Sequence, residues 1–423
     1  MMIARWQERE LEAILKWFRV VNLTGARQSG KTTLTEMLSL PRVKRFTLDD
    51  DEIRKSASND PFGFIERSSG ETIIIDEIQK VPELLNAIKR KVDQNNDKGQ
   101  YLLTGSSNLH FVKAVSDSLA GRISRVRLRT LTFGEINGGR GDFLDRAFAR
   151  DLSDDISTLS KRNVIAHAVV GGYPEVMGMD KKMRRRWFQT YLDDLLVKDI
   201  RDVTEIRKLD VLKEIAKWLL TYSSKFFEIS ELASKTGVSV STVETYISAL
   251  KALYLFDEVK PWTKSDYSKI GKRSKYFAAD SGLIANILGW DEESIYMSDD
   301  RSGKIIESWV YQNLASIVDL SQEYEISQYR DSNKREIDFI VERTDGAMLG
   351  IEVKAGSSNS FSIFSLFCNL ICESTIISIF KYAFIGNPYF SLPSFILFIN
   401  YIILYSYQWR STQVGDEAPL LRA

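Results

Sequence analysis

The residue types with the clearest chemical potential lie between Gly25 and Thr33. A mainly apolar stretch, Val20–Leu23, leads into Gly-Ala-Arg-Gln-Ser-Gly-Lys-Thr, the pattern of a phosphate-binding loop between a strand and a helix. Glycine permits backbone angles that turn successive N–H groups toward an anion. The lysine of such a loop reaches the β- and γ-phosphates, and the hydroxyl after it binds Mg²⁺. The pattern therefore predicts a site for a nucleoside triphosphate with Mg²⁺.

Within this loop, Lys31 is expected to contact the phosphates and take part in catalysis, and Thr32 to bind Mg²⁺. A chance glycine-rich turn is the alternative, and the preceding strand and a second motif downstream disfavour it. The residues expected to surround the nucleotide are Gly25, Ala26, Arg27, Gln28, Ser29, Gly30, Lys31, Thr32 and Thr33.

The second motif supplies two carboxylates. The apolar run Thr72–Ile75 ends in Asp76 and Glu77, and such a run is typical of a strand buried on both faces of a parallel sheet. Ligands bind at the carboxyl ends of strands in these sheets. We therefore expect Asp76 to hold Mg²⁺ and Glu77 to be the general base for an attacking water. The alternative, an ordinary solvated strand end, is disfavoured by the loop upstream.

Two further positions are candidates for contact with the transferred phosphate. The stretch 100–108 is expected to be a strand with a polar tip, on which Ser106 is the preferred sensor and Thr104 and Asn108 are close alternatives. A simple Gly-Ser-Ser-Asn turn explains the same residues equally well. Arg122 is a candidate for stabilising transition-state charge, in cis or from a neighbouring subunit, with a surface arginine as the alternative.

Four segments, in this order, resemble one family: Gly25–Leu34, Ile75–Leu85, Leu103–Asn108 and Ser118–Arg122. They are similar to the AAA-type P-loop ATPases of archaea and bacteria that carry a winged-helix segment and a C-terminal domain of unassigned function. The resemblance covers roughly residues 5–356. It implies an AAA-type core that uses ATP and Mg²⁺, with Gln79 near the nucleotide, but it implies no known substrate.

The alternation of strand and helix signals predicts an α/β fold, with a parallel P-loop NTPase sheet first. Helical apolar spacing at 183–196 looks like the family's helical lid. The predicted divisions are an AAA-type core at 1–150, a helical lid at 151–225, a winged helix at 226–265, a restriction-endonuclease-like α/β domain at 270–356, expected to be incomplete, and an atypical apolar tail at 357–423.

Residues 227–250 read as two helices joined by a turn at Gly237, which is the pattern of a helix-turn-helix. DNA is therefore a candidate partner. The second helix exposes Ser241, Thr242, Glu244 and Thr245, however, and no arginine or lysine precedes Lys251. Base-reading helices usually carry such residues, so a winged helix used for packing is the favoured interpretation.

Four residues near the C-terminal end could form a second site. Strand alternation places Glu352 and Lys354 on one face, and Asp338 on the partner strand can reach that face. With Glu307 from a helix, these oxygens would bind a divalent metal, which could activate a water that Lys354 orients in catalysis. One by one, the four residues resemble the pattern of the PD-(D/E)XK nuclease superfamily. A charged hairpin without chemistry is the alternative.

The tail departs from this family pattern. From Ser357 to Gln408 the only charged residues are Glu373 and Lys381. The leading hypothesis is a shifted reading frame or rearranged gene end, which would truncate the nuclease-like module. A transmembrane segment within 382–409 is the rival.

Composition narrows the function classes. The 423 residues include 57 basic and 57 acidic residues, so zero net charge gives no global signal for nucleic acid or membrane. The sequence has two cysteines, which disfavour a disulfide framework, and two histidines, which disfavour a His-based site. A cytoplasmic location is expected from the low cysteine content.

The leading hypothesis is an ATPase coupled to DNA binding or cleavage. The alternatives are a nucleotide-gated DNA- or protein-binding module with an inert nuclease-like domain, and a decayed gene product. The sequence does not determine whether the protein forms a homo-oligomer.

Overall fold

The computed structural model describes residues 2–66, 71–106, 119, 121–149, 151, 159–202, 206, 208–263, 273–331, 333–355 and 405–407. The sensor candidate Asn108 lies outside these residues, and so does the apolar tail apart from the backbone of Tyr405–Tyr407. Both hypotheses about the tail therefore concern residues that the structure does not describe. Among the described residues, no helix is both long and apolar enough to cross a bilayer.

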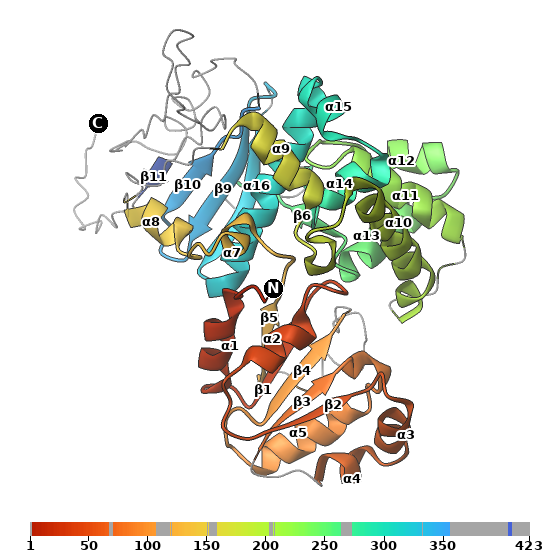
Figure 1. Cartoon of the computed structure of the whole chain (residues 1–423), viewed down its shortest axis with the longest axis vertical. Helices are drawn as coiled ribbons and strands as arrows, with labels where there is room; N and C mark the ends of the chain where they lie inside the picture. The colour runs from red at the N-terminus through yellow and green to blue at the C-terminus, as the bar shows by residue number, and fades with distance from the viewer. Residues whose placement is uncertain are drawn as a thin grey trace, which may run out of the picture.

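A five-stranded sheet forms the centre of the N-terminal module, at the lower end of Figure 1. Its order is β2-β3-β4-β1-β5, and every neighbouring pair is parallel. This confirms the predicted α/β class with a parallel P-loop-type sheet. The strands are β1 (Val20–Thr24), β2 (Val43–Thr47), β3 (Thr72–Asp76), β4 (Tyr101–Gly105) and β5 (Ile123–Arg127).

Helices cover both faces of this sheet, which explains the uninterrupted apolar runs of its strands. On one face Val21 and Leu23 of β1 pack with Leu34. On the other face Val20 packs with Ile88, because successive side chains of a strand point to opposite sides. The first face is covered by α1 (Gln7–Leu15) and α2 (Lys31–Met37), and the second by α3 (Asp51–Asn59), α4 (Pro61–Glu66) and α5 (Leu84–Gln94).

A helical region follows the N-terminal module. It packs on the C-terminal part of the chain through one continuous apolar core. Its elements are α7 (Phe133–Ile136), α8 (Phe143–Ala149), α9 (Lys161–Val170), η3 (Pro174–Val176), α10 (Lys181–Val197), η4 (Asp199–Asp202), α11 (Leu209–Thr221), α12 (Ile229–Thr236) and α13 (Val240–Ala252).

The segment predicted to be a winged helix, 226–265, contains α12, α13 and β6 (Phe256–Val259), and β6 pairs antiparallel with β7 (Lys275–Ala278), which lies beyond that segment. This pairing crosses the predicted division between 265 and 270. β7 lies in the segment predicted to be the C-terminal α/β domain but pairs with β6 and not with the C-terminal sheet. Local sequence indicates a strand but not its partner, and the predicted division stays a prediction.

The C-terminal module is an antiparallel sheet of order β11-β10-β9-β8, with the long helix α16 beside it (Figure 1). Phe339 of β9 pairs with Ile351 of β10, so Asp338 and Glu352 lie next to this pair. The elements are α14 (Ser281–Leu288), α15 (Glu292–Tyr296), α16 (Asp299–Ser321), β8 (Tyr324–Arg330), β9 (Glu336–Arg343), β10 (Met348–Ile351) and β11 (Tyr405–Tyr407).

Candidate active site

The phosphate loop connects β1 to α2 in a conformation that needs glycine. A Cβ on Gly25 would lie 2.1 Å from the carbonyl oxygen of Leu128, and Gly25 has a φ of +154°. Gly30, directly before α2, has a φ of +95°. The loop can therefore pass close to Leu128, the residue that follows β5, and lead directly into α2, at whose N-terminus anions bind favourably.

Lys31 lies inside this loop. Its Nζ donates hydrogen bonds to the carbonyl oxygens of Gly25 and Ala26, each at 3.0 Å, and the residue is 5% exposed. Burial lowers the pKa of Lys31, while Glu77 and Asp76 act in the opposite direction. The ammonium group is thus held where the loop would surround a phosphate.

The pair predicted to hold Mg²⁺ is brought together. Thr32 Oγ1 donates to Asp76 Oδ2 at 3.0 Å, although the two residues lie on different elements. The hydroxyl of Thr104 also donates to Asp76, so this alternative sensor contacts the carboxylate. A hydroxyl and a carboxylate beside a phosphate loop suit Mg²⁺, which prefers oxygen ligands and usually binds through few protein groups.

Glu77 has a left-handed backbone conformation, with φ +58° and ψ +43°. Such conformations are costly for residues other than glycine and persist where the surroundings impose them. Its carboxylate accepts hydrogen bonds from the Gln79 amide and from Ser106 Oγ, the latter at 3.2 Å. Gln79 Nε2 also lies 3.2 Å from Ser106 Oγ. The predicted base and the preferred sensor are therefore neighbours, and Gln79 contacts both of them.

These groups line a cavity of about 410 Å³ at the carboxyl edge of the sheet. Part of its wall comes from the segment predicted to be a lid. The lining residues are Arg27, Gln28, Gly30, Lys31, Thr32, Thr33, Asp49, Glu77, Gln79, Lys80, Ser106, Pro174, Glu175 and Asp199.

Three residues that sequence reasoning did not assign to the site hold the loop in place. Arg5 donates to the carbonyl oxygens of Ser29, at 2.9 Å, and Arg129, at 2.7 Å. Tyr191 of α10 donates to the carbonyl oxygen of Arg27 at 3.0 Å. Asp199 accepts from the Arg27 guanidinium. No sequence motif connects these distant residues to the loop, so no signal could have identified them.

Arg122 does not lie beside the nucleotide cavity, in contrast to the role predicted for it in cis. It immediately precedes β5 and pairs with Asp93. Because β5 runs parallel to β1, with Thr24 opposite Arg127, Arg122 lies at the sheet edge opposite the phosphate loop. This placement contradicts the predicted role in cis. A role from a neighbouring subunit stays a prediction.

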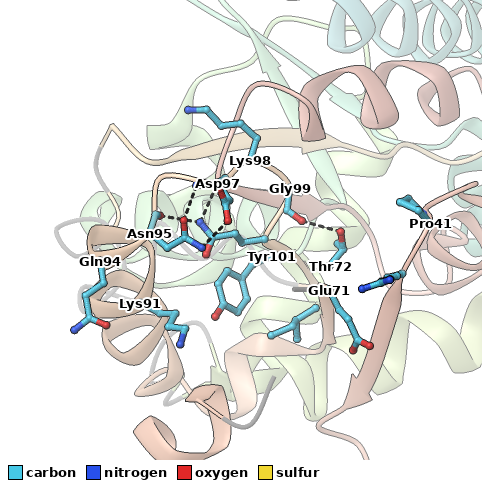
Figure 2. A pocket seen from close by; sticks show the side chains of 13 residues that line it. Pro41, Glu71, Thr72, Lys91, Gln94, Asn95, Asp97, Lys98, Gly99 and Tyr101 are labelled. Carbon is cyan, nitrogen blue, oxygen red and sulfur yellow. Dashed lines mark hydrogen bonds between the residues drawn. The ribbon is translucent and has the colours of Figure 1, made fainter. Parts of the chain in front are cut away.

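A cavity of about 630 Å³ lies at this opposite edge, where Thr72 of β3 and Tyr101 of β4 line it. Figure 2 shows the side chains that line the cavity. Several of its polar groups are bound to one another, for example Thr72 Oγ1 to the carbonyl oxygen of Gly99 at 2.8 Å. Burial raises the pKa of Tyr101, which also lines it, to about 12. The cavity is larger than the one beside Lys31 but lacks the phosphate loop, so we do not assign the nucleotide to it.

The four predicted residues of the second site also converge. Burial, together with the neighbouring Asp338 carboxylate, holds the pKa of Glu307 and Glu352 above their usual range. Lys354 bonds to Glu352. Among the residues that the structure describes, however, no group of three or more His, Cys, Asp or Glu is arranged to hold a metal ion. The Lys275 ammonium, which sequence reasoning missed, lies 3.0 Å from Glu307 and 3.5 Å from Asp338.

Three segments of the chain match the models of known protein families. Residues 18–137 match the model of the AAA domain, so the N-terminal module is similar to that domain. Residues 161–294 and 302–379 match two domains of unknown function, DUF8612 and DUF4143. The DUF8612 match includes both β6 and β7, and the described C-terminal sheet apart from β11 lies within the DUF4143 match.

The relatives are uncharacterised proteins. Rv2008c of Mycobacterium tuberculosis is 27% identical over 349 residues, 81% of this chain and 72% of its own length. A Haemophilus influenzae protein is 24% identical over 224 residues, 51% of this chain and 52% of its own.

Among solved structures, a Pyrococcus horikoshii STAND protein with a tetratricopeptide repeat sensor, PH0952, is 12% identical, with a TM-score of 0.27 over 76% of this chain and 51% of that one. The Drosophila ORC structure bound to AT-rich DNA and Cdc6 is 11% identical, with a TM-score of 0.22 over 67% of this chain and 90% of that one. Similarities this weak carry no argument about this chain.

Proposed function

We propose that the N-terminal module binds ATP with Mg²⁺ and hydrolyses it. One observation carries this proposal: Lys31, the Thr32–Asp76 pair and Glu77 line or adjoin a single cavity at the carboxyl edge of a parallel sheet. The loop amides and the Lys31 ammonium would bind the phosphates. Thr32 and Asp76 would hold Mg²⁺, which supplies charge neutralisation to the triphosphate.

Glu77 is the residue that would accept a proton from the attacking water. Its carboxylate is held by Gln79 and Ser106, so these two side chains would orient the base and, through it, the water. Phosphate release from Mg–ATP by the wild-type protein, and its loss in Glu77→Gln with binding retained, tests the proposal.

A second function, a nucleotide-gated binding module, is favoured by the contacts of the phosphate loop itself. Arg27 pairs with Asp199, and its carbonyl oxygen accepts from Tyr191. A triphosphate in the loop would compete with Asp199 for the Arg27 guanidinium and so alter the position of η4, which closely follows α10. In this function, turnover would be slow and binding of a partner would be the output. ATP-dependent affinity for DNA or protein in the absence of measurable hydrolysis would favour it.

DNA and protein are both retained as partners in this second proposal. The exposed residues of α13 include Ser241, Glu244 and Thr245 but no cation before Lys251, and a basic surface normally supplies the affinity for phosphates. This composition favours a protein partner. Arg122, at the far edge of the sheet, is proposed to act only across a subunit interface, if the protein assembles with copies of itself.

A further inference from the structure

We propose that Arg5 is a positioning residue that couples the phosphate loop to α16 through one peptide unit of the loop, the unit between Ser29 and Gly30. This role rests on the proposed binding of Mg–ATP and adds a regulatory connection to it. The connection runs through the protein interior to the C-terminal module, and it is separate from the pair of Arg27 and Asp199 in the cavity wall.

The Arg5 guanidinium is bound in three directions. Nη1 donates to the carbonyl oxygen of Ser29 at 2.9 Å, and Nη2 donates to that of Arg129 at 2.7 Å. Nε donates to Glu135 Oε1 at 2.9 Å. Arg5 is 7% exposed and directly precedes the N-cap of α1. Because a guanidinium presents five N–H donors in a fixed plane, one side chain joins three segments that are distant in sequence.

The charge of Arg5 is balanced inside the protein. Glu135, whose side chain is 1% exposed, also accepts from the backbone N–H of Trp6 at 3.1 Å. Its other oxygen accepts from the backbone N–H of Thr132 at 2.9 Å and from the Thr132 hydroxyl at 3.1 Å. A buried ion pair is favourable when further hydrogen bonds satisfy its carboxylate in this way. Arg5 therefore has a fixed position from which to orient the loop.

The contact with Ser29 fixes the orientation of one peptide unit. In a trans peptide unit the carbonyl group and the following N–H point in opposite directions. When Arg5 holds the carbonyl oxygen of Ser29, the N–H of Gly30 points away from Arg5. Gly30 lines the nucleotide cavity, whereas Ser29 is fully buried. A phosphate that accepts from the Gly30 N–H would therefore favour the same orientation of this unit as Arg5 does.

The contact with Arg129 leads to the connecting segment, defined as residues 128–132 between β5 and α7. Consecutive residues of this segment are bound to α16. The hydrogen bonds are Arg129 Nε to Asp319 Oδ2 at 2.6 Å, Gln312 Nε2 to Thr130 Oγ1 at 3.0 Å, and Gln312 Nε2 to the carbonyl oxygen of Leu131 at 3.4 Å. The phosphate loop and the segment that carries these bonds therefore share one buried guanidinium group.

Occupancy of the loop and the contact with α16 should support each other. A phosphate on the Gly30 N–H stabilises the Ser29 carbonyl in the orientation that Arg5 binds. Arg5, when held against the connecting segment, in turn prepares Gly30 for the phosphate. A coupling of this kind is reciprocal in free energy. Without the Arg5 guanidinium, the loop and the connecting segment should become independent of each other.

Equilibrium binding of Mg–ATP to the full chain tests the positioning role. Arg5→Lys keeps the positive charge but loses the planar arrangement of donors. Its affinity should fall about tenfold, the effect of one lost hydrogen bond to a charged group. Arg9→Lys, at an exposed position of α1, is the matched control and should bind as the wild type does.

The outcomes separate this role from the proposed function. A wild type that does not bind Mg–ATP would remove both. A wild type that binds, with equal affinity in a folded Arg5→Lys protein, would overturn the role of Arg5 alone. Glu135→Gln is a second variant if Arg5→Lys does not fold, because it keeps Arg5 but neutralises the carboxylate that holds it. It should weaken Mg–ATP binding severalfold, and unchanged affinity would likewise overturn the role.

Hydrogen exchange tests the coupling to α16. The amides of Leu131 and Phe133 donate to the Gly172 carbonyl oxygen and to Asn313 of α16. In the wild type, saturating Mg–ATP should slow their exchange at least severalfold. In Arg5→Lys, at a concentration that saturates this variant, the slowing should be lost, which a merely structural role would not cause. Equal slowing in both proteins, or none in a wild type that binds Mg–ATP, would overturn the coupling.

Discussion

The guanidinium group of Arg27 is bound to the carboxylate of Asp199, with Nη1 2.8 Å from Oδ1 and 3.1 Å from Oδ2. Arg27 belongs to the phosphate loop and Asp199 to the segment predicted to be a lid, and both line the same cavity. The Arg27 side chain is 49% exposed, so the pair contributes little to stability in itself. Because the pair lies in this cavity, a bound triphosphate and the Asp199 carboxylate would compete for the Arg27 guanidinium.

Asp199→Asn is therefore expected to raise the affinity for Mg–ATP about fivefold, which corresponds to roughly 1 kcal/mol for a partly exposed ion pair. Titration with a fluorescent ATP analogue measures it. Asp193→Asn, which removes the partner of Lys213 from the exposed face of α10, is the matched control. A loss of affinity in Asp199→Asn would show that this carboxylate supports the loop instead of competing with the nucleotide.

Glu77→Gln is expected to bind Mg–ATP with nearly wild-type affinity but to release phosphate at least about a hundredfold more slowly, since general-base catalysis typically contributes 10²–10⁴ in rate. The neutral amide retains the shape of the side chain but is a poor proton acceptor. Single-turnover hydrolysis separates the two quantities. Glu175→Gln, also in the cavity wall, should retain normal turnover. Equal rates in Glu77→Gln and the wild type would assign the base elsewhere.

Asp257→Asn is expected to destabilise the protein by about 3 kcal/mol, because it removes one of the two carboxylates, Asp257 and Asp319, that Arg127 and Arg129 share in a buried site. The Asp257 carboxylate is 2.5 Å from Arg129 and 2.8 Å from Arg127. Although burial raises the pKa of Asp257, these two arginines hold it well below its usual range. Denaturant unfolding measures the loss.

The control for this network is Asp345→Asn, in which a half-exposed carboxylate paired with Arg343 is neutralised. It should cost less than about 1 kcal/mol. A similar cost for the two substitutions would mean that the Asp257 network contributes no more than a surface ion pair.

Asp280 makes stability depend on pH in a defined direction. Burial raises the pKa of Asp280 to about 6, although the backbone N–H groups of Gly172 and Gly282 each donate to it at 2.8 Å. Between its ordinary value and about 6, the folded protein binds more protons than the unfolded chain, so stability increases as the pH falls through this range.

The wild type should therefore gain about 1 kcal/mol relative to Asp280→Asn when the pH is lowered from near 7 to near 5. The difference between the two proteins isolates Asp280, because other titrating groups are common to both. Parallel unfolding curves at the two pH values provide the measurement. A constant difference would mean that Asp280 has the same pKa in the folded and unfolded states.

The sequence predicted those parts of the site that are encoded locally. A strand–loop–helix motif identifies Lys31 and Thr32, and the end of an apolar strand identifies Asp76 and Glu77. The parallel topology of the sheet then brings these two pairs of residues to the same edge. Asp199 and Lys275 approach their partners from distant segments, where no local pattern distinguishes them from surface charges.

Arg122 shows a different limit. Its position before β5 places it at the amino edge of the sheet, and the sequence motif alone did not reveal which edge it occupies. The pairing of β7 with β6 across the predicted division at residue 270 could not be predicted for a related reason, since it depends on contacts between residues distant in sequence.

The central claim is that a triphosphate binds around Lys31, and equilibrium binding of Mg–ATP to Lys31→Ala tests it most directly. Loss of the charge-assisted contact should weaken affinity about a hundredfold, or ~3 kcal/mol. Lys80→Ala, which removes a more exposed lysine from the same cavity, should bind nearly as the wild type does. Unchanged affinity in a folded Lys31→Ala protein would contradict the assignment of the site.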